Sequence, residues 1–187
     1  MEFKVFGKWD INGIEIRHLG IKEYVNLTPK LVPHSCGRHS KKMLRKNSIS
    51  IVERLINKVM LTEKNTGKKG LAFKIVRNAF DIVNRKTKKN PVEVLIEAII
   101  NASPREETTR VSYGGIIYHK SVDVSPQRRV DLALSFIVRG AWKASFKTKK
   151  SIEEALADEI IAAANYNMSA FSISRKEEIE RIAKSSR

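Results

Sequence analysis

The sequence contains little that could cross-link the chain or place it in a membrane. Cys36 is the only cysteine, so no internal disulfide can form, which agrees with a reducing compartment. No apolar run approaches the roughly 20 residues that span a bilayer, and we expect no membrane partner. The first ten residues, MEFKVFGKWD, lack the apolar core of a signal peptide, so we expect a cytoplasmic protein.

Motifs of catalysis and cofactor binding are also missing. The segment NTGKKG lacks the spacing and the preceding buried strand of a phosphate-binding loop. His34, Cys36 and His39 offer three ligands where structural zinc sites use four, which favours phosphate or base contacts over a metal. Glu106 and Glu107 are expected to complement a helix dipole rather than to act as acid and base. We therefore expect no enzyme, no metal and no cofactor.

Negative charge is scarce. The chain has 36 Lys and Arg against 20 Asp and Glu, a net charge of +16 and a pI near 10.1. The excess is concentrated in residues 28–50 (+6), 62–90 (+7) and 105–150 (+6). Unbalanced charge costs self-repulsion, and charge in blocks is typical of binding faces. With 42% hydrophobic residues the chain can still fold, so the composition indicates a folded protein with an anionic partner, nucleic acid above all.

Helical periodicity dominates after residue 50, and a start signal precedes five of six helical segments. These signals are Ser50 with Glu53, Asn90 with Pro91, Ser125 with Pro126, Ser151 with Glu154, and Ser174 with Glu177; the sixth segment is 69–86. Before them, Asn12-Gly13 predicts a tight turn between short strands, and LGIKEYV predicts one helical turn. The pattern predicts a mainly α protein, a six-helix bundle-like domain that carries one β-ribbon.

Residues 28–50, the basic arm, contain Pro29, Pro33 and Gly37 and show little apolar periodicity. We predict an extended segment that contacts nucleic acid. The alternative is a disordered basic tail without a specific partner. Its cations, all candidate RNA contacts, are Lys30, Arg38, Lys41, Lys42, Arg45 and Lys46. We predict a division into an N-terminal extension with the arm, 1–46, and a helical domain, 47–187, with a hairpin at about 108–124.

The segment TTRVSYGGIIYHKSVDV predicts a β-hairpin that turns at Gly114-Gly115. Tyr113 then pairs with Ile116, and alternation places them on one apolar, aromatic face with Val111 and Tyr118. Arg110, Ser112, Ile117, His119 and Ser121 share the other face, which makes Arg110 a further candidate contact. Two faces of different character favour a projecting arm, and the alternative is a hairpin lying flat on the helical core.

Arg128 and Arg129 fall in the first turn of their helix, where the helix dipole disfavours cations but free N–H groups bind phosphate. Helical spacing places Arg128, Arg139 and Lys143 on one side, with Arg129 beside them. A phosphate backbone passing this side would turn a local penalty into an attraction. Tyrosines among cations favour RNA, because their rings can stack on unpaired bases.

Long colinear motifs resemble a known family, the small-subunit ribosomal protein seven family, in its archaeal and eukaryotic branch (numbered five in eukaryotes). The motifs are NPVEVLIEAIINASPREETTRVSYGGIIYHKSVDVSPQRRVDLAL, LVPHSCGRHSKKMLRKNSISIVERLINKVM, KKSIEEALADEIIAAA and SISRKEEIERIAKSSR. The resemblance implies a structural protein of the small ribosomal subunit, with six helices, a protruding hairpin and no catalytic residue.

The resemblance also implies partners. The protein would be a primary binder of the 3′ major domain of small-subunit rRNA and nucleate assembly of the subunit head. The hairpin tip, Tyr113, Gly114, Gly115, Ile116 and Ile117, would face exit-site tRNA and the mRNA path, next to ribosomal protein eleven. The resemblance implies rRNA contacts at Lys68 and Lys69, in addition to the cations of the arm and to Arg128 and Arg129. Two rivals remain: a free-standing DNA-binding regulator that uses the helix after residue 125, and a small RNA-processing enzyme.

Overall fold

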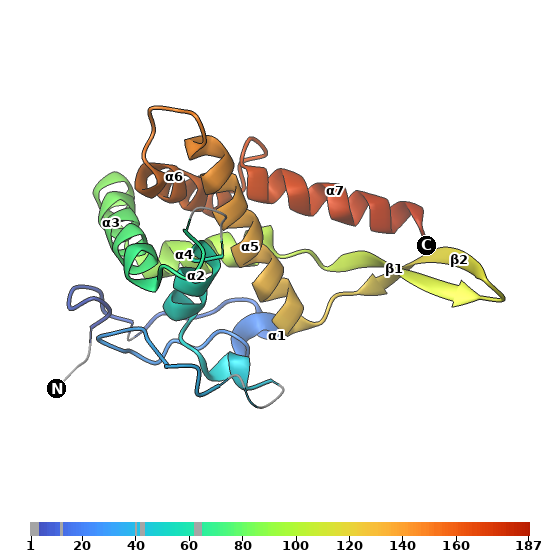
Figure 1. Ribbon diagram of the computed structural model, residues 1–187, viewed down its shortest axis with the longest axis horizontal. Helices are drawn as coiled ribbons and strands as arrows, with labels where there is room; N and C mark the ends of the chain where they lie inside the picture. Colours follow the sequence, from blue (N-terminus) through green and yellow to red (C-terminus); the bar gives the residue numbers. More distant parts are fainter. Residues whose placement is uncertain (1–3, 12, 40, 42–43, 62–64) are drawn as a thin grey trace.

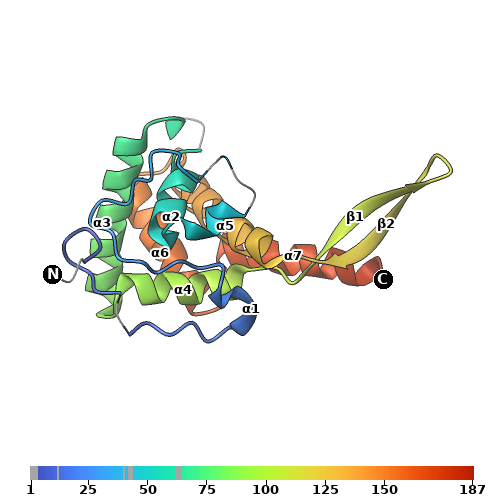
Figure 2. The same ribbon diagram turned by 90° about the horizontal axis from the view of Figure 1, so that it is seen from below.

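The computed structural model describes residues 4–11, 13–39, 41, 44–61 and 65–187. Helices form a rounded body, and a two-stranded ribbon projects from one end of it beside the last helix (Figures 1 and 2). The mainly α fold with a protruding hairpin is therefore confirmed. The elements are α1 (Leu19–Lys22), η1 (Arg45–Ser48), α2 (Ile51–Val59), α3 (Lys69–Thr87), α4 (Pro91–Ala102), β1 (Glu106–Tyr113), β2 (Ile116–Asp123), α5 (Pro126–Ser145), α6 (Ile152–Ala164) and α7 (Phe171–Ser185).

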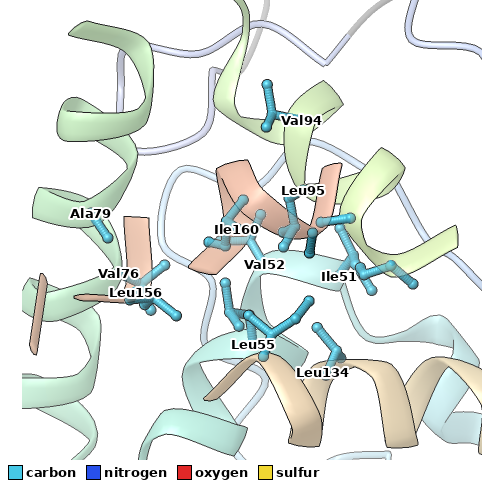
Figure 3. Packing of buried hydrophobic residues seen from close by; sticks show 14 of the residues in the cluster. Ile51, Val52, Leu55, Val76, Ala79, Val94, Leu95, Leu134, Leu156 and Ile160 are labelled. Atoms are coloured by element: carbon cyan, nitrogen blue, oxygen red, sulfur yellow. The ribbon is translucent and has the colours of Figure 1, made fainter. Parts of the chain in front are cut away.

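Helix α6 lies at the centre of the body and packs against α3, α4 and α5. Leu156 and Ile160 of α6 are buried with Leu95 of α4 and Leu134 of α5, and Leu55 of α2 closes the cluster (Figure 3). Because apolar residues recur every three to four positions on each helix, each has one face to bury in this core. Burial of these faces, rather than local propensity, holds the helices in place.

The start signals are only partly confirmed. Asn90 and Ser151 accept hydrogen bonds from the backbone N–H groups of Val92 and Glu154, as expected of N-caps. Ser50 is the N-cap of α2 but makes no side-chain capping bond, and the Glu53 carboxylate bonds to Ser35 instead of to Ser50. The Ser174–Glu177 signal is wrong.

The last helix begins three residues before Ser174. Ala170 is the N-cap of α7, so Ser174 lies inside the first turn of that helix. Its backbone N–H donates to the Ala170 carbonyl. A serine in a helix start can therefore be mistaken for its cap when the true cap has no hydroxyl.

The N-terminal residues cover the underside of the helical body in Figure 1. Val5, Ile11, Ile16, Ile21 and Val25 are buried in the same core as the helices. The predicted helical turn is confirmed as α1. Short strands were predicted on both sides of Asn12-Gly13. Asn12 lies outside the described residues, and the described residues on either side of it form no strand, so this prediction is wrong. The short bridge instead joins Val5 and Trp9. The division at residue 46 stays a prediction.

The hairpin has the predicted register. Tyr113 pairs with Ile116 and Arg110 with His119 in the antiparallel ladder. Gly114 and Gly115 both have positive φ, +57° and +82°, which the tight turn requires and which glycine adopts without strain. The strands extend from 106 to 123, so Glu106 and Glu107 lie in β1, and their predicted role at a helix start is wrong.

The hairpin does not lie flat on the helical core. Tyr113 is 80% exposed and Ile116 is 59% exposed, and the whole segment from 110 to 120 is on the surface. Support lies at the base: the backbone N–H of Ser121 donates to the carbonyl of Ser186 at the end of α7, and Arg128 of α5 donates to Glu107 of β1. The projecting ribbon is the arrangement that the two-faced pattern favoured.

Candidate nucleic-acid interface

A cationic groove runs along α5 where this helix packs on α2. One hollow of about 410 Å³ is lined by Lys58, Ser135, Arg139 and Lys143, among others. An adjoining hollow of similar volume shares Lys58 and Ser135 and reaches Arg128. Arg128, Arg139 and Lys143 are exposed along one side of the 20-residue helix, as helical spacing predicted. The groove therefore presents a row of cations over the length of α5.

Lys58 is the member of this row that sequence reasoning missed. Burial lowers the pKa of its ammonium; Asp131 opposes this, while Lys46, Arg54 and Arg139 lower the pKa further. Three like charges close enough to perturb Lys58 raise the local positive potential, which a bound phosphate would relieve. Its signal in the sequence was its place on the polar side of an amphipathic helix, which a count of charge by segment does not show.

Asp131 of α5 connects the basic arm to the helical core. Its two oxygens accept hydrogen bonds from Lys46 Nζ at 2.5 Å and from Arg54 Nη2 at 3.1 Å. Arg54 is 2% exposed, and its Nη1 also donates to the Tyr24 carbonyl at 2.8 Å. Partial burial raises the pKa of the Asp131 carboxyl, but the bonds from Lys46 and Arg54 outweigh it and hold that pKa below its usual range. Lys46, a predicted RNA contact, thus lies beside the α5 groove.

Glu53 forms a second anchor for the arm. Its carboxylate is fully buried, and Oε1 accepts hydrogen bonds from the Ser35 backbone N–H at 2.7 Å, from Ser35 Oγ at 2.8 Å and from Lys69 Nζ at 3.1 Å. Burial raises the pKa of Glu53, and the bonds from Ser35 and Lys69 lower it below its ordinary value. Buried polar groups of this kind fix one geometry. The middle of the arm is therefore held against α2 and the start of α3.

The two arginines at the start of α5 have different surroundings. Arg128 donates to both oxygens of Glu107 on β1, from Nε at 2.6 Å and from Nη2 at 3.0 Å. These bonds raise the pKa of Arg128. Burial lowers the pKa of Arg129, and the neighbouring charge of Arg105 lowers it further. The Nε of Arg129 is buried and has no hydrogen-bond partner among the described residues.

The remaining predicted contacts are spread over three places. In the arm, Lys41 and Arg45 are exposed, Lys30 is half-buried and the Nε of exposed Arg38 donates to the Ser35 carbonyl. Lys42 lies outside the described residues. Lys68 is exposed just before α3, whereas Lys69 turns inward to Glu53. Arg110 is exposed on the hairpin, away from the groove. The structure thus brings Arg128, Arg139 and Lys143 to one surface, with Lys46 bonded to Asp131 beside them.

The described residues show no metal-ligating group. Within the described ranges, no three His, Cys, Asp or Glu side chains come together as metal ligands. His34 Nδ1 accepts a hydrogen bond from the Cys36 backbone N–H at 3.0 Å and lies 3.2 Å from its Sγ. In the same part of the chain, no helix has the length and apolar character needed to cross a membrane.

Known proteins resemble this chain over nearly its whole length. A family model described as "Ribosomal protein S7p/S5e" matches residues 21–187. The "Small ribosomal subunit protein uS7" of Methanothermobacter thermautotrophicus is 58% identical over 97% of both chains. The protein of the same name from Methanothrix thermoacetophila is 56% identical over 98% of this chain and 100% of its own length.

Proposed function

The chain belongs to the ribosomal protein S7p/S5e family, and from that premise we propose that it is a primary binder of the 3′ major domain of small-subunit rRNA. The family predicted from the sequence motifs is confirmed. Its members are structural proteins of the small ribosomal subunit that bind rRNA, and they are not enzymes. The chain is accordingly a cytoplasmic ribosomal protein whose partners are rRNA and other ribosomal proteins.

The observation that carries the proposal is the cationic groove along α5, with Lys46 of the arm anchored beside it. Phosphate contacts from Lys and Arg supply most of the affinity in such complexes, and contacts from separate elements fix the register of the RNA. The arm and α2 are adjacent in the sequence, whereas α5 comes from a distant part, and the bonds of Glu53 and Asp131 hold the three together. A surface of this kind binds several RNA segments in a fixed arrangement, as nucleation of the subunit head requires.

The hairpin has a separate part in the proposal. Its tip, Tyr113 to Ile117, faces exit-site tRNA and the mRNA path, next to ribosomal protein eleven. Support comes from the exposure of the tip and from the position of Tyr118 and Arg110 on opposite faces of the ribbon. Exposed tyrosines can stack on unpaired bases while cations contact phosphates.

The test is binding of the purified protein to two rRNA transcripts, the 3′ major domain and the 5′ domain, with footprinting of the bound RNA. We expect tight binding and a defined footprint on the 3′ major domain alone. Alanine at Arg139 and Lys143 should weaken binding and lower the slope of log affinity against log salt by about 0.7–0.9 for each phosphate that is no longer neutralised. Equal affinity for both transcripts would refute the assignment to the head.

No observation favours a DNA-binding regulator. A recognition helix has to be free to enter a groove of the duplex. Helix α5 packs against α2, α4, α6 and α7, and its first turn is bonded to Glu107 of the hairpin. The groove along α5 is therefore better suited to follow a phosphate backbone than to read base edges in duplex DNA.

A further inference from the structure

An apolar hollow adjoins the cationic groove on the other side of Trp142. It has a volume of about 270 Å³ and lies where α3, α5 and the start of α6 meet. Leu71, Ile75, Trp142, Phe146 and Ile152 form much of its wall. The centroids of the Trp142 and Phe146 rings lie 5.2 Å apart with 30° between the ring planes, so two tilted aromatic rings already stack at its edge. Val138 and Trp142 line both this hollow and the groove, which makes the two spaces direct neighbours.

One polar side chain in this wall has an unused acceptor. Asn65 is only 7% exposed, and its Nδ2 donates to the Val59 carbonyl at 3.2 Å. Its Oδ1 is buried and has no hydrogen-bond partner among the described residues. A buried polar atom without a partner costs free energy, and a ligand that donates a hydrogen bond to Oδ1 would remove this cost. Asn65 thus adds one directional contact to an otherwise apolar site.

The charges around the hollow select the kind of ligand. The residues that line the hollow and the nearer half of the groove include Lys58, Arg139, Lys143 and Lys147 and no Asp or Glu, while Asp131 lines the farther half beside Arg128. A ligand with an apolar, flat, hydrogen-bond-donating part and a flanking negative charge matches both spaces. An unpaired nucleotide has these properties: its base has two aromatic faces and N–H donors on its edge, and its phosphates are anionic.

We propose that the hollow binds a single unstacked base of the RNA whose backbone follows the α5 groove. The base extends the Trp142–Phe146 pair and donates to Asn65 Oδ1, while Lys58, Arg139 and Lys143 hold the adjacent phosphates. The volume of about 270 Å³ lies just below the roughly 300–1,000 Å³ typical of ligand sites and is large enough for one base. This inference rests on the proposed RNA-binding function and adds an unpaired nucleotide to it.

The test uses tryptophan fluorescence, because the chain has two tryptophans. The variant Trp9→Phe reports Trp142 alone, and Trp142→Phe reports Trp9 as the matched control. The probes are single-stranded oligoadenylate and a backbone of the same length without bases. We expect oligoadenylate to quench Trp142 strongly and the abasic backbone to bind with little quenching. Neither probe should quench Trp9.

Substitutions separate the base contact from the phosphate contacts. Asn65→Leu should weaken oligoadenylate binding about five- to tenfold, as expected for one buried hydrogen bond, and leave abasic binding unchanged. Leu71→Tyr narrows the hollow and should also weaken oligoadenylate binding without changing abasic binding. Leu19→Tyr, at an 82% exposed site, should change neither affinity. The helical signal and the urea midpoint of each variant show whether it is folded. Because Asn65→Leu and Leu71→Tyr alter the hollow independently, the test does not depend on one substitution alone.

Three results would overturn the base site. Equal quenching by the two probes would show that only phosphates bind. Unchanged oligoadenylate affinity in folded Asn65→Leu and Leu71→Tyr would exclude the hollow. Quenching by an acidic, phenylalanine-containing peptide, with none by oligoadenylate, would assign the hollow to a protein partner. None of these results changes the outcome of the two-transcript rRNA assay, which tests the proposed function by itself.

Discussion

The ion pair between Glu107 and Arg128 provides the sharpest test of the α5 groove. Arg128 is 56% exposed and donates two hydrogen bonds to Glu107, which is 24% exposed. If Arg128 binds a phosphate, the RNA has to compete with this carboxylate. The variant Glu107→Gln removes the competing charge while keeping the size of the side chain, so we expect it to raise rRNA affinity.

The size of the effect follows from the exposure of the pair. A solvent-exposed ion pair is worth about 0.2–1 kcal/mol, so its loss should raise the affinity at low salt by up to about fivefold. Arg128→Gln should act in the opposite direction and reduce the salt slope by about 0.7–0.9. Between 50 and 200 mM salt, a slope difference of that size corresponds to about a threefold change in relative affinity. Filter binding to the 3′ major domain transcript over this range measures both quantities.

The control is Glu178→Gln on α7. Glu178 pairs with the exposed Arg175 at 2.5 Å, so this variant makes the same change in net charge away from the groove. We expect a smaller rise in affinity from the control than from Glu107→Gln. Competition between Glu107 and the RNA is refuted if both glutamine variants raise affinity equally, or if Glu107→Gln still raises it when Arg128 is already glutamine. In either case Glu107 would act only through net charge.

Three further variants test the anchors and the hairpin. Glu53→Ala removes the buried acceptor of Ser35 and leaves Lys69 unpaired, so the free energy of unfolding in urea should fall by about 3–5 kcal/mol. The Ser35 amide should also exchange faster with D₂O. Unchanged exchange would mean that Glu53 does not hold the arm. The folded-state pKa of Asp131 is depressed, so its contribution is present above the ordinary pKa of about 4 and is lost as pH falls through the lower folded value. Urea stability of the native chain should therefore decline more steeply below about pH 4 than that of Asp131→Asn, and parallel declines would contradict this. Tyr113→Ala, at an 80% exposed site, should change stability by less than about 0.5 kcal/mol yet reduce crosslinking of the hairpin to exit-site tRNA; full crosslinking would exclude a tip contact.

Local signals in the sequence predicted the elements well. The Gly114-Gly115 turn determined the whole hairpin register, because a two-residue turn leaves one pairing scheme. Asn90 and Ser151 marked helix starts, since each side chain bonds to its own helix. Ser174 misled because Ala170, the true N-cap, has no side-chain signal. Such predictions succeed where the partner of a side chain lies within a few residues.

Contacts between residues far apart in the sequence could not be predicted from local patterns. Glu53 stands three positions after Ser50 and looks like part of a capping box, yet its partners are Ser35 and Lys69. Lys58 carries no motif and enters the groove only because α2 packs beside α5. Blocks of charge predicted that the chain binds an anion. Which cations share a surface depends on the packing of helices, and the sequence contains no local sign of it.

The two faces of the hairpin have different surroundings at the base and toward the tip. Alternation in the sequence separated an apolar face from a cationic one but left open which face makes contacts. In the structure both faces are occupied at the base: Glu107 on one face bonds to Arg128 of α5, and Glu106 on the other bonds to Arg187 after α7. Beyond the base, from 110 to 120, both faces are exposed. The base therefore acts as a clamped support, and the distal half can contact partners on both sides, with tyrosines on one face and Arg110 and His119 on the other.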